Sequence, residues 1–252
     1  MEEQPQPLEK ETAEINGSKT HRLRVVIVFL FLLTVFLVSV YTFILQRNYS
    51  ENTLESAVEW NTQCADAIHK LVLQKLTGED YKNISSIADM QSERYQRLQK
   101  ELSELRKLNP TRYLYTAKMG ADGRPIYLID GLDLDAKDFA YPGTYIEKEV
   151  VPYIEAALAG ETVYSQEIVD TTWGHIFTAC YPVREDTGEV IGAICMEMDM
   201  EYTYKLVDQS NRVAVKMAMV AVIVLVLFAL GAYYLIQKSR TKSEKQQEQL
   251  QK

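Results

Sequence analysis

The chain is poor in the residues that most often carry nucleophilic or metal chemistry. It has 3 histidines and 3 cysteines in 252 residues. Three cysteines cannot form a framework of disulfides, which excludes the disulfide-rich secreted scaffolds. Besides His21 near the N-terminus, the histidines are His69 and His175, so a Ser-His-Asp triad has little support. We therefore expect no enzyme active site and no cofactor in these residues.

A zinc site at His175, Cys180 and Cys195 is also disfavoured. Side chains alternate between the two faces of a strand, so His175 and Cys180 point to opposite faces of the strand predicted there. The aspartates between Asp133 and Asp138 lack the glycine and the closing glutamate of an EF-hand loop. They are typical of a solvated acidic turn, and we expect no metal.

Two long apolar runs lack charge altogether. Val25–Leu45 and Met217–Ile236 each hold about 20 residues, enough for a helix to cross a hydrocarbon core of about 30 Å. The absence of charge within them argues against a transporter or channel. The first run is too long for a signal-peptide core, and no small-residue cleavage site follows it. Both runs are predicted to be membrane-spanning helices, the first an uncleaved anchor.

Basic residues flank the outer ends of the two runs. Lys19, Arg22 and Arg24 precede the first run, and Lys238 and Arg240 follow the second. Such residues stay cytoplasmic, so both termini are predicted to lie inside the cell. The prediction is a disordered cytoplasmic tail over residues 1–24, membrane helices over 25–45 and 213–236, an extracytoplasmic domain over 46–212, and a helical cytoplasmic tail over 237–252.

The central segment is acidic, with 17 Lys and Arg against 28 Asp and Glu from Gln46 to Arg212, a net charge of −11. We expect no nucleic-acid partner. Its first part is helical in pattern. Apolar residues recur every three or four positions from Gln46 to about Leu76, and a second helix with Ser85 or Ser86 as its N-cap is predicted to stop at Asn109-Pro110.

Beyond Pro110 the pattern changes to strands and turns. The predicted strands are Thr111–Lys118, Pro125–Asp130, Val163–Val169, Gly174–Val183 and Val190–Asp199, with a short helix at about Glu147–Leu158. This order predicts an α+β domain with an antiparallel sheet and long N-terminal helices.

Cys180 and Cys195 flank the hairpin predicted around Thr187-Gly188. A loop of two or four residues there would place the two cysteines directly opposite each other. A cross-strand disulfide and a pair of buried free thiols both stay open.

Three segments resemble a known family. The strand Trp173–Val183 resembles a pattern G-x-x-x-S/T-x-x-x-P-I/V, and Thr187–Asp199 resembles a closing strand that begins G-x-V-I-G. Arg112–Thr116 followed by Asp122–Tyr127 resembles a first hairpin. Together they resemble the single Cache domain, a PAS-like extracytoplasmic sensor found between two membrane helices in bacterial histidine kinases, diguanylate cyclases and chemoreceptors.

The resemblance implies a pocket for a small ligand, a carboxylate or an amino acid, between the sheet and the loop and helix that cross it. Asp170 resembles the position that holds the ligand's amine, although the Arg-x-Trp pair that clamps the carboxylate is not evident here. The implied lining is Tyr115, Tyr127, Asp130, Tyr141, Asp170, Trp173, His175 and Thr178. The plainer alternatives are that the aromatic residues are core, that Asp170 caps a turn, and that His175 lies on the surface.

The resemblance also implies signalling. A ligand would favour one of two states of the domain, and the last strand would pass that change through Met200–Asn211 to the second membrane helix. The long first helix predicts a homodimer. Residues 237–252 resemble the start of a connector, so the output is expected in a longer protein or in a separate cytoplasmic partner. The alternative is a membrane-anchored structural protein whose PAS-like module dimerises without a ligand.

Overall fold

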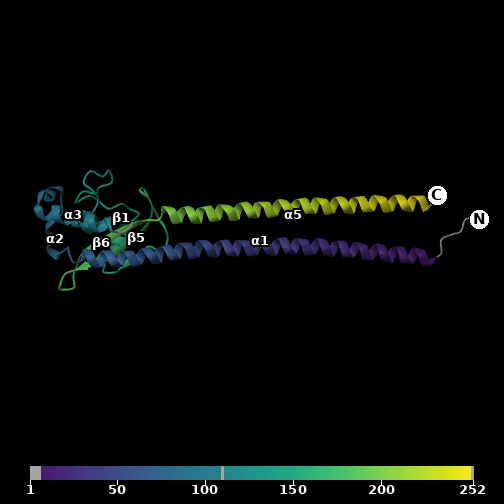
Figure 1. Ribbon diagram of the computed structural model, residues 1–252, viewed down its shortest axis with the longest axis horizontal. Helices are drawn as coiled ribbons and strands as arrows, with labels where there is room; N and C mark the ends of the chain where they lie inside the picture. The colour runs from purple at the N-terminus through teal and green to yellow at the C-terminus, as the bar shows by residue number, and fades with distance from the viewer. Residues whose placement is uncertain (1–6, 109–110, 251–252) are drawn as a thin grey trace, which may run out of the picture. The chain divides into compact units, whose positions relative to one another are not determined.

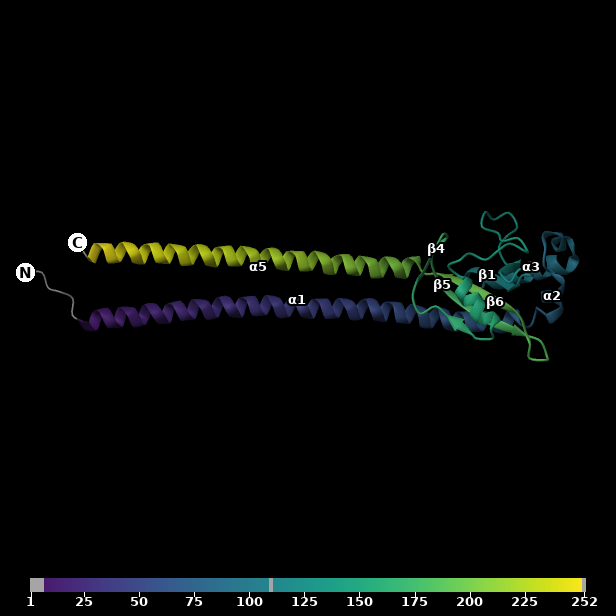
Figure 2. The same ribbon diagram turned by 180° about the vertical axis from the view of Figure 1, so that it is seen from behind.

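The computed structural model describes residues 7–108 and 111–250. Figures 1 and 2 show two long helices and a small domain of sheet and short helices, with the main elements labelled. In chain order they are α1 Pro7–Val72, α2 Gly78–Asn83, a 3₁₀ helix η1 Ile87–Gln91, α3 Glu93–Lys107, β1 Thr111–Met119, β2 Pro125–Asp130, α4 Val151–Leu158, β3 Val163–Tyr164, β4 Val169–Thr171, β5 Gly174–Arg184, β6 Val190–Asp199 and α5 Glu201–Leu250.

The chain divides into two compact units. One holds the described residues up to Tyr49 and those from Gln209 onward, and the other is Ser50–Asp208. The first contains the two predicted membrane segments, which lie in helices long and apolar enough to cross a membrane. The hydroxyls of Thr34, Ser39 and Thr42 each bond at 2.8 Å to the carbonyl four residues earlier. The few polar side chains of the first apolar run are therefore satisfied within their own helix.

The predicted disordered tail needs a correction. Residues 1–6 lie outside the described residues, but α1 already includes residues 7–24. Glu, Lys and Ala, which favour helices, dominate Leu8–Ile15, and Pro7 stands at the helix start, where its missing N–H costs nothing. The helix therefore begins well before the first apolar run.

The unit Ser50–Asp208 is built on an antiparallel sheet of order β2-β1-β6-β5-β3, with β4 also pairing with β5. Alternate residues of each strand enter two cores. Leu114 and Phe177 pack toward α1, α2 and α3, whereas Tyr115 and Cys195 pack toward α4 and the loop before it. The predicted α+β class is confirmed, and β2 and β6 have the predicted bounds.

The helical region is more divided than predicted. The first helix ends at Val72 rather than about Leu76. Thr77 is the N-cap of an additional short helix, α2, and its N–H donates to Asp80 at 2.7 Å. Ser86 caps only the 3₁₀ helix η1, where its N–H donates to Asp89 at 2.8 Å. The true N-cap of α3 is Ser92, whose hydroxyl accepts from the N–H of Tyr95 at 3.1 Å. Each of these short polar residues thus starts a helix, and Ser92 also ends the one before it.

Two other boundaries also differ. The predicted strand Val163–Val169 is broken because Ser165 takes over the pairing with Thr178: its N–H donates to the Thr178 carbonyl at 2.8 Å, and its hydroxyl accepts from the Thr178 N–H at 3.0 Å. Helix α4 begins at Val151 rather than Glu147, with a proline in its first turn.

Cys180 and Cys195 are directly opposite each other, as predicted, but by a different route. Arg184 pairs with Val190 across a five-residue loop, and a bulge between Val183 and Arg184 restores the register. The two sulfurs lie 2.7 Å apart as buried free thiols.

Candidate ligand pocket

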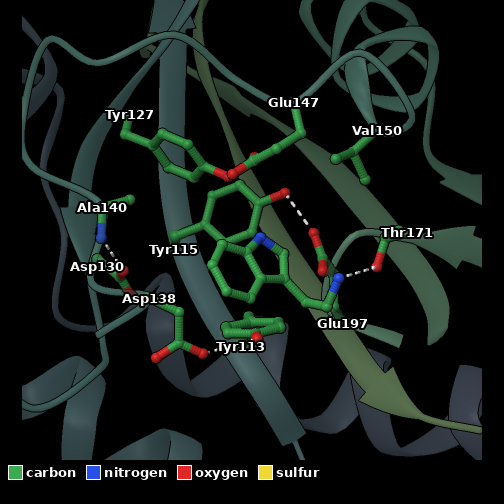
Figure 3. Close-up of a pocket in the computed structure, with 11 residues that line it drawn as sticks. Tyr113, Tyr115, Tyr127, Asp130, Asp138, Ala140, Glu147, Val150, Thr171 and Glu197 are labelled. Atoms are coloured by element: carbon green, nitrogen blue, oxygen red, sulfur yellow. Dashed lines mark hydrogen bonds between the residues drawn. The ribbon is translucent and has the colours of Figure 1, made fainter. Parts of the chain in front are cut away.

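A small cavity of about 20 Å³ lies on the α4 side of the sheet. It holds about one water molecule, so a larger ligand needs some of its walls to move. Figure 3 shows its lining. The lining residues are Tyr113, Tyr115, Tyr127, Asp130, Asp138, Ala140, Glu147, Val150, Thr171, Trp173 and Glu197.

Three tyrosines of the lining each donate a hydrogen bond to a different carboxylate. Tyr113 donates to Asp138 at 2.8 Å, and Tyr115 donates to Glu197 at 2.8 Å. Tyr127 donates to Glu147. On β1, Tyr113 and Tyr115 face the cavity, and Leu114 between them faces the core on the other side of the sheet. The Tyr115 and Tyr127 rings meet edge to face, with their centroids 4.8 Å apart. The tyrosines thus form an aromatic wall with a carboxylate at each hydroxyl.

Asp130 holds the loop that covers the cavity. Its carboxylate accepts hydrogen bonds from the backbone N–H of Leu132 at 2.9 Å and of Ala140 at 2.8 Å. Burial raises the pKa of Asp130 to about 6, although these two bonds favour the ionised form. Because these two bonds tie Leu132 and Ala140, at the two ends of the loop, to one side chain, Asp130 fixes the path of the loop over the pocket.

Glu197 is, with Asp130, one of two acids of the lining that are almost fully buried. Its residue is only 5% exposed, and burial raises its pKa to about 7, with Glu147 and Asp130 acting in the same direction. Its Oε1 accepts from Tyr115, and its Oε2 accepts no hydrogen bond from any described residue. Thr178 lies opposite Glu197 on β5, and its buried hydroxyl also lacks a partner among the described residues.

The lining is strongly acidic. It holds four carboxylates, and none of its described residues is Lys or Arg. The nearest guanidinium groups have other partners: Arg112 lies 3.6 Å from Asp199, and Arg106 donates to the carbonyl of Gly131 at 2.9 Å. Within the described residues, no cluster of three or more His, Cys, Asp or Glu side chains could hold a metal ion.

Four of the eight predicted site residues line this cavity: Tyr115, Tyr127, Asp130 and Trp173. The turn that carries Trp173 is closed by Thr171, whose hydroxyl accepts from the Trp173 N–H at 3.2 Å, and by Gly174 with φ 120°, a conformation that favours glycine. Trp173 is 40% exposed, so it is the part of the wall that can move most easily.

The other four predicted residues lie outside the lining. Thr178 is buried in the sheet beside Glu197. Tyr141 is exposed and contacts Phe139. Asp170 is exposed on β4, opposite His175. The structure therefore separates Asp170, which the resemblance assigned to a ligand amine, from the cavity.

His175 connects the sheet with α5. As expected from strand alternation, it lies on the face opposite to Cys180. Its ring stacks on that of Tyr204 at 3.6 Å, its Nδ1 is 3.5 Å from Asp170, and its Nε2 is 3.9 Å from Glu201. The N–H of Met200 also donates to its carbonyl at 2.9 Å. His175 is therefore a contact residue at the root of α5.

Sequence reasoning missed several lining residues, above all Glu197, Glu147, Asp138 and Tyr113. Glu197 carried a signal: it is the one acid inside the apolar stretch Val190–Met198. An acid in a buried strand costs free energy unless it has a function or a partner. Asp138 and Glu147 lie in loops, where the pattern of the sequence does not predict which side chains turn inward.

No family model matches the chain, and no curated protein matches it in sequence. The solved structures that it resembles include sensor domains of chemoreceptors and histidine kinases. The sensory domain of the Campylobacter jejuni chemoreceptor Tlp3 with isoleucine bound matches 70% of this chain, with 14% identity and a TM-score of 0.42. This chain spans 65% of the length of that one.

Two further likenesses are weaker. The V. cholerae histidine kinase DctB sensor domain matches 60% of this chain and 59% of its own, with 13% identity and a TM-score of 0.36. The E. coli DcuS sensor domain matches 60% of this chain and 98% of its own, with 12% identity and a TM-score of 0.30. At such identities and TM-scores, these likenesses establish neither a family nor a ligand for this chain.

Proposed function

We propose that this chain is the input module of a two-pass bacterial membrane receptor that binds a small ligand in the pocket beside Glu197. The observation that carries this proposal is a buried acid with an unpaired oxygen in the wall of a cavity. A domain that only holds partners together has no need of such a group, because a buried acid that accepts a single hydrogen bond costs stability.

The β4–β5 hairpin gives this pocket a route to α5. Thr171 and Trp173 at its turn line the cavity, and His175, two residues later, contacts Glu201 and Tyr204 of α5. A ligand that displaces Trp173 would pull on this hairpin and so change the contacts of the first turns of α5. Sensing and output would then be coupled through a segment only a few residues long.

The proposal includes a location and partners. Residues 46–212 would face the outside of the cell, and both termini the cytoplasm, as the flanking basic residues indicate. The receptor would act as a homodimer and pass its signal to a cytoplasmic output domain or partner. This chain would itself catalyse no reaction, and its similarity to the single Cache family supports a sensor without naming the ligand.

A thermal-melt screen of the whole chain in lipid nanodiscs tests the sensor function. The screen would cover amines, carboxylates, amino acids, purines and sugars. A ligand at about 100 times its dissociation constant adds about 2.7 kcal/mol to the free energy of unfolding, which raises the melting temperature by about 5 °C. Trp173→Ala should abolish the shift, whereas Asp170→Ala, outside the cavity, should leave it unchanged.

One observation favours the second candidate, a structural protein without a ligand. The cavity is small, and its tyrosines and acids are largely bonded to one another. Melts that stay flat across all classes of compound would reject the sensor and favour this alternative.

A further inference from the structure

The chemistry of the pocket also bears on the class of ligand, given the sensor function proposed above. Its four acids, Asp130, Asp138, Glu147 and Glu197, come from different parts of the fold, and among the lining residues that the structure describes no basic side chain neutralises them. Their present partners are neutral donors, tyrosine hydroxyls and backbone N–H groups. The pocket therefore has excess negative charge that its own residues do not balance.

Glu197 is the acid of the lining that is best placed to pair with a positively charged ligand. Its carboxylate is almost fully buried, and Oε2 has no donor among the described residues. The Thr178 hydroxyl opposite it is buried and unpaired as well. An ammonium group supplies several N–H donors and one positive charge, so it could satisfy Oε2 and compensate the buried acid at once.

The rest of the wall suits the organic part of such a cation. The Tyr115 and Tyr127 rings pack against each other in the lining that also holds Glu197, and the half-exposed Trp173 completes the aromatic part of that lining. Aromatic faces attract cations and pack well against alkyl groups. The same wall offers a carboxylate ligand no charged donor, because Arg112 is paired with Asp199 outside the lining.

We infer that the pocket takes a small organic cation, an alkylammonium, whose charge pairs with Glu197 and whose alkyl chain lies against Tyr115, Tyr127 and Trp173. A ligand carboxylate would instead meet four acids and no basic side chain of the lining, so the carboxylate ligands implied by the resemblance are disfavoured. The small size of the cavity limits the alkyl part to a few carbons, even after Trp173 moves.

The ionisation of Glu197 gives the inference a distinctive pH dependence. The charged or titratable groups that act on it are Arg112 and Tyr115 from β1, Asp130 at the end of β2 and Glu147 from the loop before α4. With a pKa of about 7, ionised Glu197 rises from about a tenth at pH 6 to about nine tenths at pH 8. Asp130 titrates lower and acts in the same direction. Affinity for a cation should therefore rise about ninefold over this range, and affinity for an anion should fall.

The two tryptophans of the chain allow a direct titration. Trp60 is 61% exposed on α1, and Trp60→Phe leaves Trp173 as the only tryptophan reporter. We would titrate this variant of the full chain in nanodiscs with butylammonium, with butyrate and with 4-aminobutyrate. The three probes share the four-carbon chain and differ in charge.

Butylammonium should change the Trp173 fluorescence and saturate, and butyrate should not. Glu197→Gln, which keeps the size of the side chain and removes its charge, should weaken butylammonium binding about tenfold or more. Glu161→Gln, which changes an exposed acid outside the lining, is the matched control and should change the affinity less than twofold. Circular dichroism of both variants would show whether they fold.

The outcomes separate this inference from the proposed function. Binding of butyrate, or of another anion or neutral compound, without butylammonium binding would overturn the cation and leave the sensor intact. Butylammonium affinity that does not change between pH 6 and pH 8, or that survives Glu197→Gln, would overturn the role of Glu197. If no compound of any class alters Trp173 or the melt, both the inference and the sensor fail.

Discussion

The hydroxyl of Tyr115 on β1 donates a 2.8 Å hydrogen bond to the carboxylate of Glu197 on the neighbouring strand β6. Both residues are buried, and both face the cavity (Figure 3). This bond lowers the pKa of Glu197 against the larger effect of burial, which raises it. It is the one hydrogen bond that the Glu197 carboxylate accepts from the described residues, so it is the contact that most opposes the effect of burial on the ionisation of this acid.

Tyr115→Phe removes this donor and leaves the ring in place. We expect the free energy of unfolding to fall by about 1–2 kcal/mol at pH 8, where Glu197 is mostly ionised, and by less at pH 5. Urea unfolding at the two pH values measures this. In Glu197→Gln, the additional effect of Tyr115→Phe should be smaller. An equal loss at both pH values would contradict the account.

Stability should also depend on pH through Glu197 and Asp130. Their pKa values in the folded protein, about 7 and about 6, exceed the ordinary values of 4.5 and 3.8. The folded state therefore binds protons more tightly than the unfolded state, so the stabilisation is complete at low pH and is lost as pH rises through 6 and 7. The melting temperature without ligand should fall by about 10 °C from pH 5 to pH 8. Glu197→Gln should flatten this slope, and a steeper slope in the variant would reject the assignment.

The paired thiols of Cys180 and Cys195 should form a disulfide on mild oxidation. They are directly opposite each other on β5 and β6, with sulfurs 2.7 Å apart, whereas Cys64 lies on α1 in the other core. Oxidised glutathione would accept the two electrons and two protons of the thiol pair. After unfolding, alkylation should label one cysteine of the oxidised chain and three of the reduced chain. Labelling of all three cysteines in both samples would show that the disulfide does not form and would contradict this prediction.

The ion pair between the buried Asp80 and Arg94 should contribute more to the free energy of unfolding than the exposed pair of Asp133 and Lys107. Asp80 is only 4% exposed and accepts two hydrogen bonds from Arg94, at 2.6 and 2.7 Å, as well as the Thr77 N–H. Burial raises its pKa, and these bonds lower it by more. Asp80→Asn should cost about 2 kcal/mol of unfolding free energy. Asp133→Asn, which breaks an exposed pair with Lys107, is the control and should leave the melting temperature nearly unchanged.

The extent to which sequence predicts this structure depends on the kind of signal. Strands β2 and β6 follow clear alternation and turn residues, and their predicted bounds are confirmed. The helical region between Val72 and Glu93 is not predictable in the same way, because Ser86, Asp89 and Ser92 are all good caps. Which of these residues becomes the N-cap of α3 depends on tertiary contacts such as that between Asp80 and Arg94.

The candidate site also contains some residues that were predicted and some that were not. Tyr115, Tyr127, Asp130 and Trp173 were implied by the resemblance to the single Cache domain, and all four line the cavity. Asp170 does not line the cavity. The strand is interrupted at Ser165, and β4, beyond the interruption, places Asp170 at the exposed edge. The inward turn of Glu147 depends on the loop that Asp130 ties down, which no local pattern encodes.

Hydrogen exchange of the whole chain in nanodiscs, with and without saturating butylammonium, tests the central claim most directly. In the wild type we expect slower exchange both around Tyr113–Tyr115 and Cys195–Glu197 and at Met200–Asp208. His175→Ala should retain butylammonium affinity within about threefold and lose the change at Met200–Asp208, whereas Tyr202→Ala, which alters an exposed side chain of α5, should retain both. Unchanged exchange at the pocket and at the start of α5 in the wild type would contradict the account.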